Sequence, residues 1–332
     1  MQRRKLGADG PDVSAIGVGA MSFADFYGPT DEAASHAILD AAREAGVSHV
    51  DTANVYGMGR SESAIGSYLR ADPGARDDFV IATKAAIARD ADGQRRFDNS
   101  AAHLEAELDR SLGRMGIDCV DLFYVHRRDP EVPIEEVAGT LRRLVEKGKT
   151  RAIGFSEIAP SSLRRAVAVH PVAAVQSEYS LATRSPGLGL LEAWAAGVVA
   201  LAAAAPVGRS LLTDAPLSLD AARGLAFLKS NPRFIEPNHA ANIAASDRLR
   251  RLAADMGEPA AALAIAWLLA RGGHVIPIPG TRSVAHFAEL VRGAAVELGP
   301  HDLARIEEAL PVGWAHGDRY SAAQWIGPER YC

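Results

Sequence analysis

The chain has 332 residues, a net charge of −5 and 23% charged residues, which is the composition of a soluble globular protein. This charge lacks the basic footprint of a nucleic-acid-binding protein, so we expect no nucleic-acid partner. The most apolar stretch, residues 195–207, is shorter than the roughly 20 residues that span a bilayer, and no apolar segment follows the basic N-terminus. These two observations predict no membrane association. Because Cys119 and Cys332 are the only cysteines, we expect no disulfide framework and a cytoplasmic location.

The chain begins with a predicted β-hairpin over residues 2–13, whose centre holds the turn-forming residues Gly7, Gly10 and Pro11. After it, short apolar runs alternate with segments of helical period. We interpret the apolar runs as strands, at residues 15–20, 47–51, 79–84, 120–126, 151–156, 172–176, 198–204 and 274–278.

The segments of helical period carry recognisable start signals. Thr30 or Asp31 can cap one helix, Asn99 or Ser100 can cap another, and Pro133 begins a third. The predicted helices are residues 31–45, 61–69, 100–112, 133–147, 161–169, 188–196, 241–256, 259–271, 283–292 and 301–310.

Two further segments lack a clear period. Residues 206–240 are rich in Pro, Gly and Asp and predict a long loop with a short helix, which is typical of a lid or an insertion. Residues 311–332 form a C-terminal tail with Trp314, Tyr320 and Trp325. Since no linker or change of composition divides the chain, we expect a single domain over residues 1–332.

Eight strands that alternate with helices favour an α/β fold, a closed (β/α)8 TIM barrel with the hairpin as an N-terminal cap and extra C-terminal helices and tail. A doubly wound nucleotide-binding sheet is the alternative. Its fingerprint is absent, because Gly17-Val18-Gly19 does not continue as G-x-G-x-x-G into a helix. In a TIM barrel the residues that follow the strand ends form the active face.

Three successive predicted strands end in polar residues. The second ends at Asp51, with Tyr56 five residues later, the third ends at Lys84 and the fourth at His126. Each residue alone has a structural explanation, as a helix cap, rim packing, a surface cation or part of a basic turn. Four such residues on adjacent strand ends of one face favour a common site.

These four side chains also make chemical sense together. A tyrosine hydroxyl has an unperturbed pKa of about 10, which a nearby ammonium such as Lys84 can lower. Asp51 can orient Lys84, and His126 can donate a hydrogen bond to a carbonyl oxygen. Tyr56 would then act as a general acid for a developing alkoxide. No side chain supplies hydride, whereas a nicotinamide cofactor does.

With these residues placed, the chain resembles the aldo-keto reductases over nearly its whole length. The motifs that carry the resemblance are residues 51–57, 83–84, 124–126, 148–156, 176–181 and 276–282. The resemblance implies a (β/α)8 barrel that binds NADPH across its mouth. It also implies reduction of a small-molecule carbonyl substrate, an aldehyde or a ketone, without a metal, using hydride from nicotinamide C4 and a proton from Tyr56.

The resemblance further implies a set of cofactor contacts. Ser156 and Gln176 would hold the nicotinamide carboxamide, and Arg282 would form a charge-assisted pair with the adenosine 2′-phosphate. The full implied set is Gly19, Met21, Asp51, Ser156, Gln176, Pro206, Gly208, Arg209, Gly280, Thr281, Arg282 and Glu289.

The chain departs from the family pattern in four places. Ala204, followed by Ala205, stands where many members have an aromatic residue and a serine at the end of strand seven. His286 and Leu290 stand where arginine and asparagine are common, and Glu157 stands where many members have asparagine.

Three other functions are compatible with parts of the pattern. A nicotinamide-sensing regulatory protein would keep the fold without catalysis, but the intact four-residue set favours an enzyme. A barrel aldolase would use Lys84 as a Schiff base. A metal hydrolase is disfavoured by ten scattered histidines without a His-x-His pair, so we expect no metal. No feature of the sequence indicates the oligomeric state.

Overall fold

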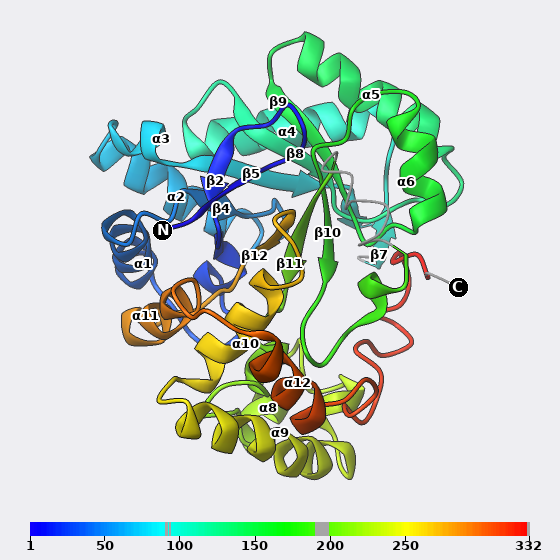
Figure 1. Cartoon of the computed structure of the whole chain (residues 1–332). Helices are drawn as coiled ribbons and strands as arrows, with labels where there is room; N and C mark the ends of the chain where they lie inside the picture. Colours follow the sequence, from blue (N-terminus) through cyan, green and yellow to red (C-terminus); the bar gives the residue numbers. More distant parts are fainter. Residues whose placement is uncertain (90–91, 93, 190–198, 331–332) are drawn as a thin grey trace.

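The structure, a computed structural model, describes residues 1–89, 92, 94–189 and 199–330. Eight parallel strands lie in the middle of the molecule with helices around them (Figure 1). They neighbour one another in chain order, from first to last β3 (Val18–Gly19), β4 (His49–Asp51), β5 (Val80–Ala85), β8 (Val120–Val125), β9 (Thr150–Ser156), β10 (Ala174–Glu178), β11 (Ala200–Ala204) and β12 (Val275–Pro277).

The first and last strands meet and close the sheet into a barrel. The Gly17 amide donates to Pro277 O at 2.8 Å, and the Gly19 amide donates to Pro279 O at 2.7 Å. Closure leaves the sheet without a free edge. The predicted (β/α)8 barrel is therefore confirmed.

The helices agree with the predicted capping. Asp31 accepts a hydrogen bond from the Ala34 amide, and Ser100 accepts one from the His103 amide. The predicted helix at 188–196 falls almost entirely outside the described residues. The described helices are α1 (Glu32–Glu44), α2 (Arg60–Ala71), α3 (Ala75–Asp78), α4 (Ala101–Met115), α5 (Ile134–Glu146), α6 (Pro160–Val167), α8 (Leu219–Gly224), α9 (Asn238–Asp255), α10 (Ala260–Leu269), α11 (Val284–Arg292) and α12 (Pro300–Ala309), with the 3-10 turns Ala20–Phe23, Ser185–Gly187, Gly208–Ser210 and Pro232–Phe234.

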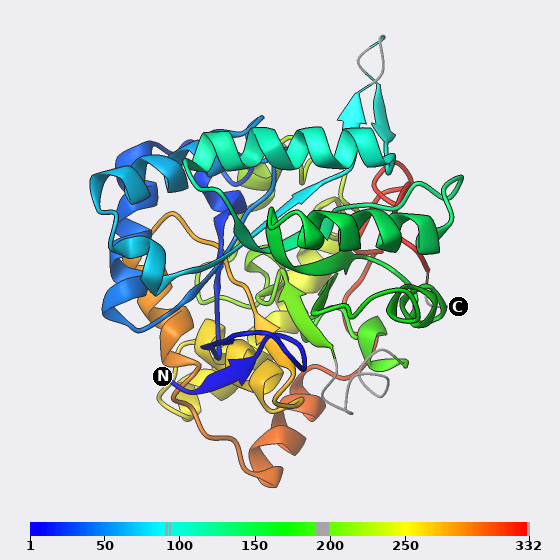
Figure 2. The ribbon, with the colours of Figure 1, turned by 90° about the horizontal axis from the view of Figure 1, so that it is seen from above.

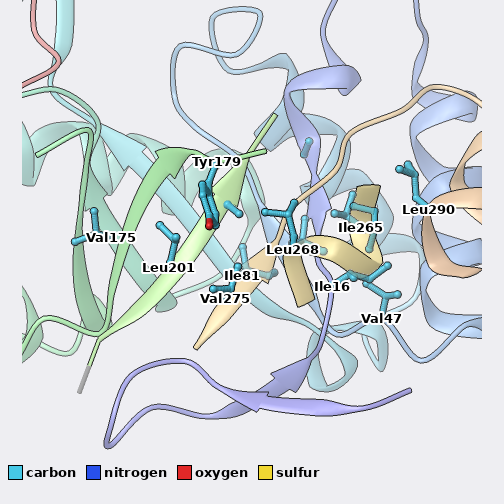
Figure 3. Close-up of a cluster of buried hydrophobic side chains, with 14 of the residues drawn as sticks. Ile16, Val47, Ile81, Val175, Tyr179, Leu201, Ile265, Leu268, Val275 and Leu290 are labelled. Atoms are coloured by element: carbon cyan, nitrogen blue, oxygen red, sulfur yellow. The ribbon is translucent and has the colours of Figure 1, made fainter. Parts of the chain in front are cut away.

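Alternation along the strands divides the core into two layers. On β8, Leu122 and Tyr124 belong to the barrel interior, whereas Phe123 and Val125 pack outward under the helices. Figure 3 shows part of the outer layer, where strand residues such as Leu201 face Leu268 of α10. The inner layer includes residues of the N-terminal hairpin, so the predicted cap packs against the barrel interior.

Two hairpins flank the barrel. The predicted one is present as β1 (Arg3–Lys5) paired with β2 (Asp12–Ser14). A second one, β6 (Ile87–Arg89) paired with β7 (Arg95–Phe97), follows β5 and was not predicted. Figure 2 shows it standing out from the barrel beside the red C-terminal tail.

Within the described residues, no single helix has the length and apolar composition of a membrane span. The helices α9 and α10 meet both criteria only when they are counted together, and the chain bends by 90° between them.

We predict that Gly154→Ala lowers the free energy of unfolding by about 1 to 3 kcal/mol, because the new methyl group overpacks the barrel interior. A Cβ at this position would lie 2.5 Å from the Tyr124 ring and 2.8 Å from Ala174 O. Urea unfolding followed by circular dichroism measures the change. As a control, Gly113→Ala in α4 meets no atom within 4 Å and should raise stability by about 1 kcal/mol through helix propensity. Equal effects of the two substitutions would contradict this packing.

Candidate active site

The four predicted catalytic residues lie together at the carboxyl end of the barrel. Asp51 ends β4, Lys84 lies near the end of β5, and His126 follows β8. Tyr56 lies in the turn after β4, which is tied to β5 by a hydrogen bond from the Asn54 amide to Lys84 O at 3.1 Å. Parallel pairing in register therefore brings these residues to one rim.

A cavity of about 670 Å³ opens at this rim, lined by Asp51, Tyr56 and His126 among other residues. Lys84 does not line it and lies fully buried below the surface of the cavity. The volume is in the usual range for small-molecule and cofactor sites.

A buried ion pair joins Lys84 to Asp51 beneath the cavity. Lys84 Nζ also donates to Thr52 O at 2.7 Å, and Gln176 Nε2 donates to Asp51 Oδ2 at 2.8 Å. Burial lowers the pKa of Lys84, and the carboxylate of Asp51 opposes that shift. Each charge thus has a partner in a place from which water is excluded.

The phenol of Tyr56 is held between two rings. Its ring packs edge-on against His126, with centroids 5.8 Å apart, and against Phe26 at 5.9 Å. Lys84 Nζ lies 5.1 Å from the ring centre. Burial, followed by the charge of Asp51, raises the pKa of Tyr56, whereas Arg127 lowers it. The phenol therefore keeps its proton at neutral pH. The sequence predicts that Lys84 lowers the pKa of Tyr56, whereas in the structure burial outweighs the nearby positive charges and the pKa is raised.

His126 is held neutral. Its pKa lies well below the usual value, first because of burial and then because of the positive charges of Arg127, Lys84 and Arg95. A neutral imidazole carries one N–H and can donate one hydrogen bond to a substrate oxygen.

The residues implied as cofactor contacts extend along the same cavity. All of them line it except Gly208, which is buried, although its chain neighbours Val207 and Arg209 line the cavity. Those that line it are Gly19, Met21, Asp51, Ser156, Gln176, Pro206, Arg209, Gly280, Thr281, Arg282 and Glu289. The four departures, Glu157, Ala204, His286 and Leu290, line it as well.

Arg282 lies at one end of this cavity and is exposed. Its Nη1 donates to Pro29 O at 2.7 Å. Among the described residues it forms no ion pair with a carboxylate. Its guanidinium is available to an anion at that end of the cavity.

A buried ionic network borders the cavity on the side of the C-terminal tail. Glu178 accepts hydrogen bonds from Arg209 and Arg233, and Glu157 accepts two from Arg319, at 2.8 and 2.6 Å. The charge of Arg209, a residue implied as a cofactor contact, is thus already balanced by Glu178. Sequence reasoning missed this network, since its partners are up to 162 residues apart in the chain.

Sequence reasoning also missed the cavity residue Arg95, and it assigned no role to Arg127, which lines the cavity in the loop after His126. The position of Arg127 directly after His126 was a usable signal, although a basic turn explains it equally well. Arg95 lies on the unpredicted hairpin strand β7, and nothing in its sequence surroundings indicates a site. In the described part of the chain, no group of three or more His, Cys, Asp or Glu side chains could hold a metal ion.

We predict that Asp51→Asn lowers the free energy of unfolding by about 3 to 5 kcal/mol, because Lys84 would stay buried without a counter-charge. The double variant Asp51→Asn/Lys84→Met should recover a large part of that loss. Chemical unfolding curves measure both. The control Asp72→Asn, which breaks an exposed pair with Arg43, should have a much smaller effect since water screens that pair. A double variant no more stable than Asp51→Asn would argue against this interpretation.

Comparison with known proteins gives a consistent result. The model of the Aldo/keto reductase family matches residues 15–311. The NADP(+) aldo-keto reductase yakc of Schizosaccharomyces pombe is 37% identical over 96% of this chain and 94% of its own length, and the probable aldo-keto reductase 1 of Glycine max is 35% identical over 96% and 92%. The solved structure of a glycerol dehydrogenase from Gluconobacter oxydans is similar with a TM-score of 0.79 at 26% identity, covering 93% of this chain and 94% of that one. The chain therefore belongs to the aldo/keto reductase family.

Proposed function

We propose that this protein is an NADPH-dependent reductase that converts an aldehyde or a ketone to an alcohol, with Tyr56 as the proton donor. The observation that carries the proposal is the geometry around Tyr56. A protonated phenol packs against the neutral imidazole of His126 at the wall of the cavity, above the buried pair of Lys84 and Asp51.

The cavity suits an extended NADPH molecule. Arg282, which has no carboxylate partner in the described residues, can receive the 2′-phosphate at one end. The hydroxyl of Ser156 and the amide of Gln176 lie with Tyr56 and His126 on the wall of the same cavity and can hold a carboxamide. Support also comes from the NADP(+) in the name of the Schizosaccharomyces pombe relative.

The bound nicotinamide would supply hydride to the carbonyl carbon. As charge develops on the carbonyl oxygen, Tyr56 donates its proton to that oxygen and His126 holds the oxygen with a hydrogen bond. Tyr56 is then left as a phenolate, which the positive charge of Arg127 favours. The buried pair of Asp51 and Lys84 contributes a fixed arrangement of charge beneath the phenol.

The aldolase alternative fits the structure poorly. Lys84 Nζ donates to Asp51 and to Thr52 O and is fully buried, so no substrate carbonyl can reach it from the cavity without breaking the ion pair. The regulatory alternative keeps the same fold and cofactor. It is separated from the proposed function by measuring turnover of NADPH with simple aldehydes.

We predict that Tyr56→Phe reduces carbonyl turnover by about 10² to 10⁴, the usual worth of a general acid, while NADPH still binds. Initial rates at saturating NADPH and a fluorescence titration of the cofactor measure the two effects. Tyr179→Phe is a matched control, because this tyrosine is buried against Trp267 outside the cavity. The role of Tyr56 would be refuted by a variant that keeps half of the normal rate.

We also predict that Arg282→Ala weakens NADPH binding about ten-fold or more and leaves NADH binding almost unchanged. The reason is the loss of a charge-assisted hydrogen bond, worth roughly 1.5 to 3 kcal/mol. Titration of both cofactors against wild type and variant measures the difference. Arg292→Ala is the control, since Arg292 ends the helix α11 that follows Arg282 but pairs with Glu258 away from the cavity. Equal weakening of the two cofactors would exclude recognition of the phosphate.

A further inference from the structure

The cations around the cavity differ in whether they have a counter-charge. Arg209 pairs with Glu178 and Arg319 pairs with Glu157, and both pairs are buried. Lys84, below the cavity, pairs with Asp51. Because each of these charges is balanced within the protein, none of them calls for an anionic ligand.

Arg127 is half-buried in the cavity wall and lacks such a partner. Its Nη1 donates to His126 O at 2.7 Å and to Ser156 Oγ at 3.0 Å, and its Nη2 lies 3.5 Å from Tyr320 Oη. All three acceptors are uncharged. Within the residues that the structure describes, no carboxylate forms an ion pair with this guanidinium, and its five N–H groups exceed these contacts. The charge of Arg127 helps to lower the pKa of Glu157, but the carboxylate of Glu157 is bonded by Arg319.

Arg95 enters the same part of the cavity from the hairpin strand β7. Its Nη2 donates to the backbone carbonyls of Ala323 and Ile326 in the tail, and its guanidinium lies 5.5 Å from the Phe97 ring centre. It too forms no ion pair with a carboxylate among the described residues. The hairpin and the tail, which lie side by side in Figure 2, thus hold a second cation without an ion pair, and Arg95 lines the cavity.

Both arginines lie at the catalytic end of the cavity. Arg127 directly follows His126 and bonds its carbonyl, and the positive charges of Arg127 and Arg95 both act on the imidazole of His126. Arg282, which also lacks an ion pair among the described residues, contacts Pro29 in a different loop. Among the described residues, one cation without an ion pair thus lies at the predicted phosphate end, and two lie beside the predicted proton donor.

We propose that Arg95 and Arg127 form an anion-recognition site for the substrate, and that the substrate is a carbonyl compound bearing a carboxylate or a phosphate. This inference rests on the proposed reductase function. A guanidinium fork matches the oxygens of both anions, and an anion at this part of the cavity wall would pair with guanidinium groups that form no ion pair within the described residues. The carbonyl group of the same molecule would then lie near Tyr56 and His126.

The test compares charged and neutral aldehydes of matched shape. One pair is 4-carboxybenzaldehyde and methyl 4-formylbenzoate, and the other is glyceraldehyde 3-phosphate and glyceraldehyde. In wild type we expect kcat/KM for the anion to exceed that of its neutral partner about ten-fold or more in at least one pair, which identifies the anion. In Arg95→Gln and in Arg127→Gln this ratio should fall about ten-fold, mainly through KM of the anionic substrate.

The matched control is Arg96→Gln. Arg96 is the next residue of the same hairpin strand, is exposed and pairs with Asp98, and it does not line the cavity. The ratio should keep its wild-type value in this variant. A wild-type ratio of one or less in both pairs, or a ratio that survives both substitutions at Arg95 and Arg127, would overturn the inference.

A binding measurement separates this inference from the proposed function. Calorimetric titration of benzoate and of benzamide into the protein, with and without saturating NADP+, needs no turnover. Tighter binding of benzoate that is lost in Arg95→Gln and Arg127→Gln supports the anion site, even if no aldehyde is reduced and the reductase function fails. Equal binding of benzoate and benzamide to wild type would refute the anion site, even if neutral aldehydes are reduced.

Discussion

The buried ion pair between Lys84 and Asp51 is the interaction on which the site depends. Removing a carboxylate and an ammonium from water costs several kcal/mol per ion, which only close partners offset. Lys84 therefore needs Asp51 and Thr52 O, and Asp51 also needs Gln176. These partners come from β4, β5 and β10. Since β5, β8 and β9 separate β4 from β10 in the sheet, the Gln176 bond crosses the barrel. The same contacts that neutralise the two charges fix the strand ends below Tyr56.

A second set of charges holds the mouth of the barrel. Glu157 directly follows β9, and Glu178 ends the adjacent strand β10. The arginines that pair with them come from the segment after β11 and from the tail. Glu157 and Arg209 both have positive φ, at 56° and 55°, a conformation that costs non-glycine residues of order 1 kcal/mol or more. Their ion pairs offset this cost. The segment after β11 thereby places Arg209 between the rings of Phe227 and Tyr320.

The sequence predicted the parts of the fold that repeat a simple pattern. Parallel strands buried on both faces read as apolar runs, and helix caps such as Asp31 and Ser100 are local signals. The candidate residues Asp51, Lys84 and His126 could be predicted because each stands at or next to the end of such a run, and Tyr56 because it lies in the turn that follows one. The hairpin of β6 and β7 was missed because it is largely exposed, so that no apolar alternation marks it. The raised pKa of Tyr56 was missed too, since the sequence shows which charges are near but not how far water is excluded.

The chemistry and the recognition of this site thus come from different parts of the chain. Strand ends and the turn after β4 supply the predicted proton donor and its partners, and the barrel ladder sets their positions. The hairpin, the segment after β11 and the tail supply the remaining cavity walls. Arg95 shows the difference, because its guanidinium is fixed by carbonyls of the tail rather than by the barrel. A change in these outer segments can alter which carbonyl compound is bound and leave the pair of Lys84 and Asp51 untouched. Loops on a rigid scaffold vary more freely than the scaffold itself, so we expect substrate choice in this protein to be set where sequence patterns carry least information.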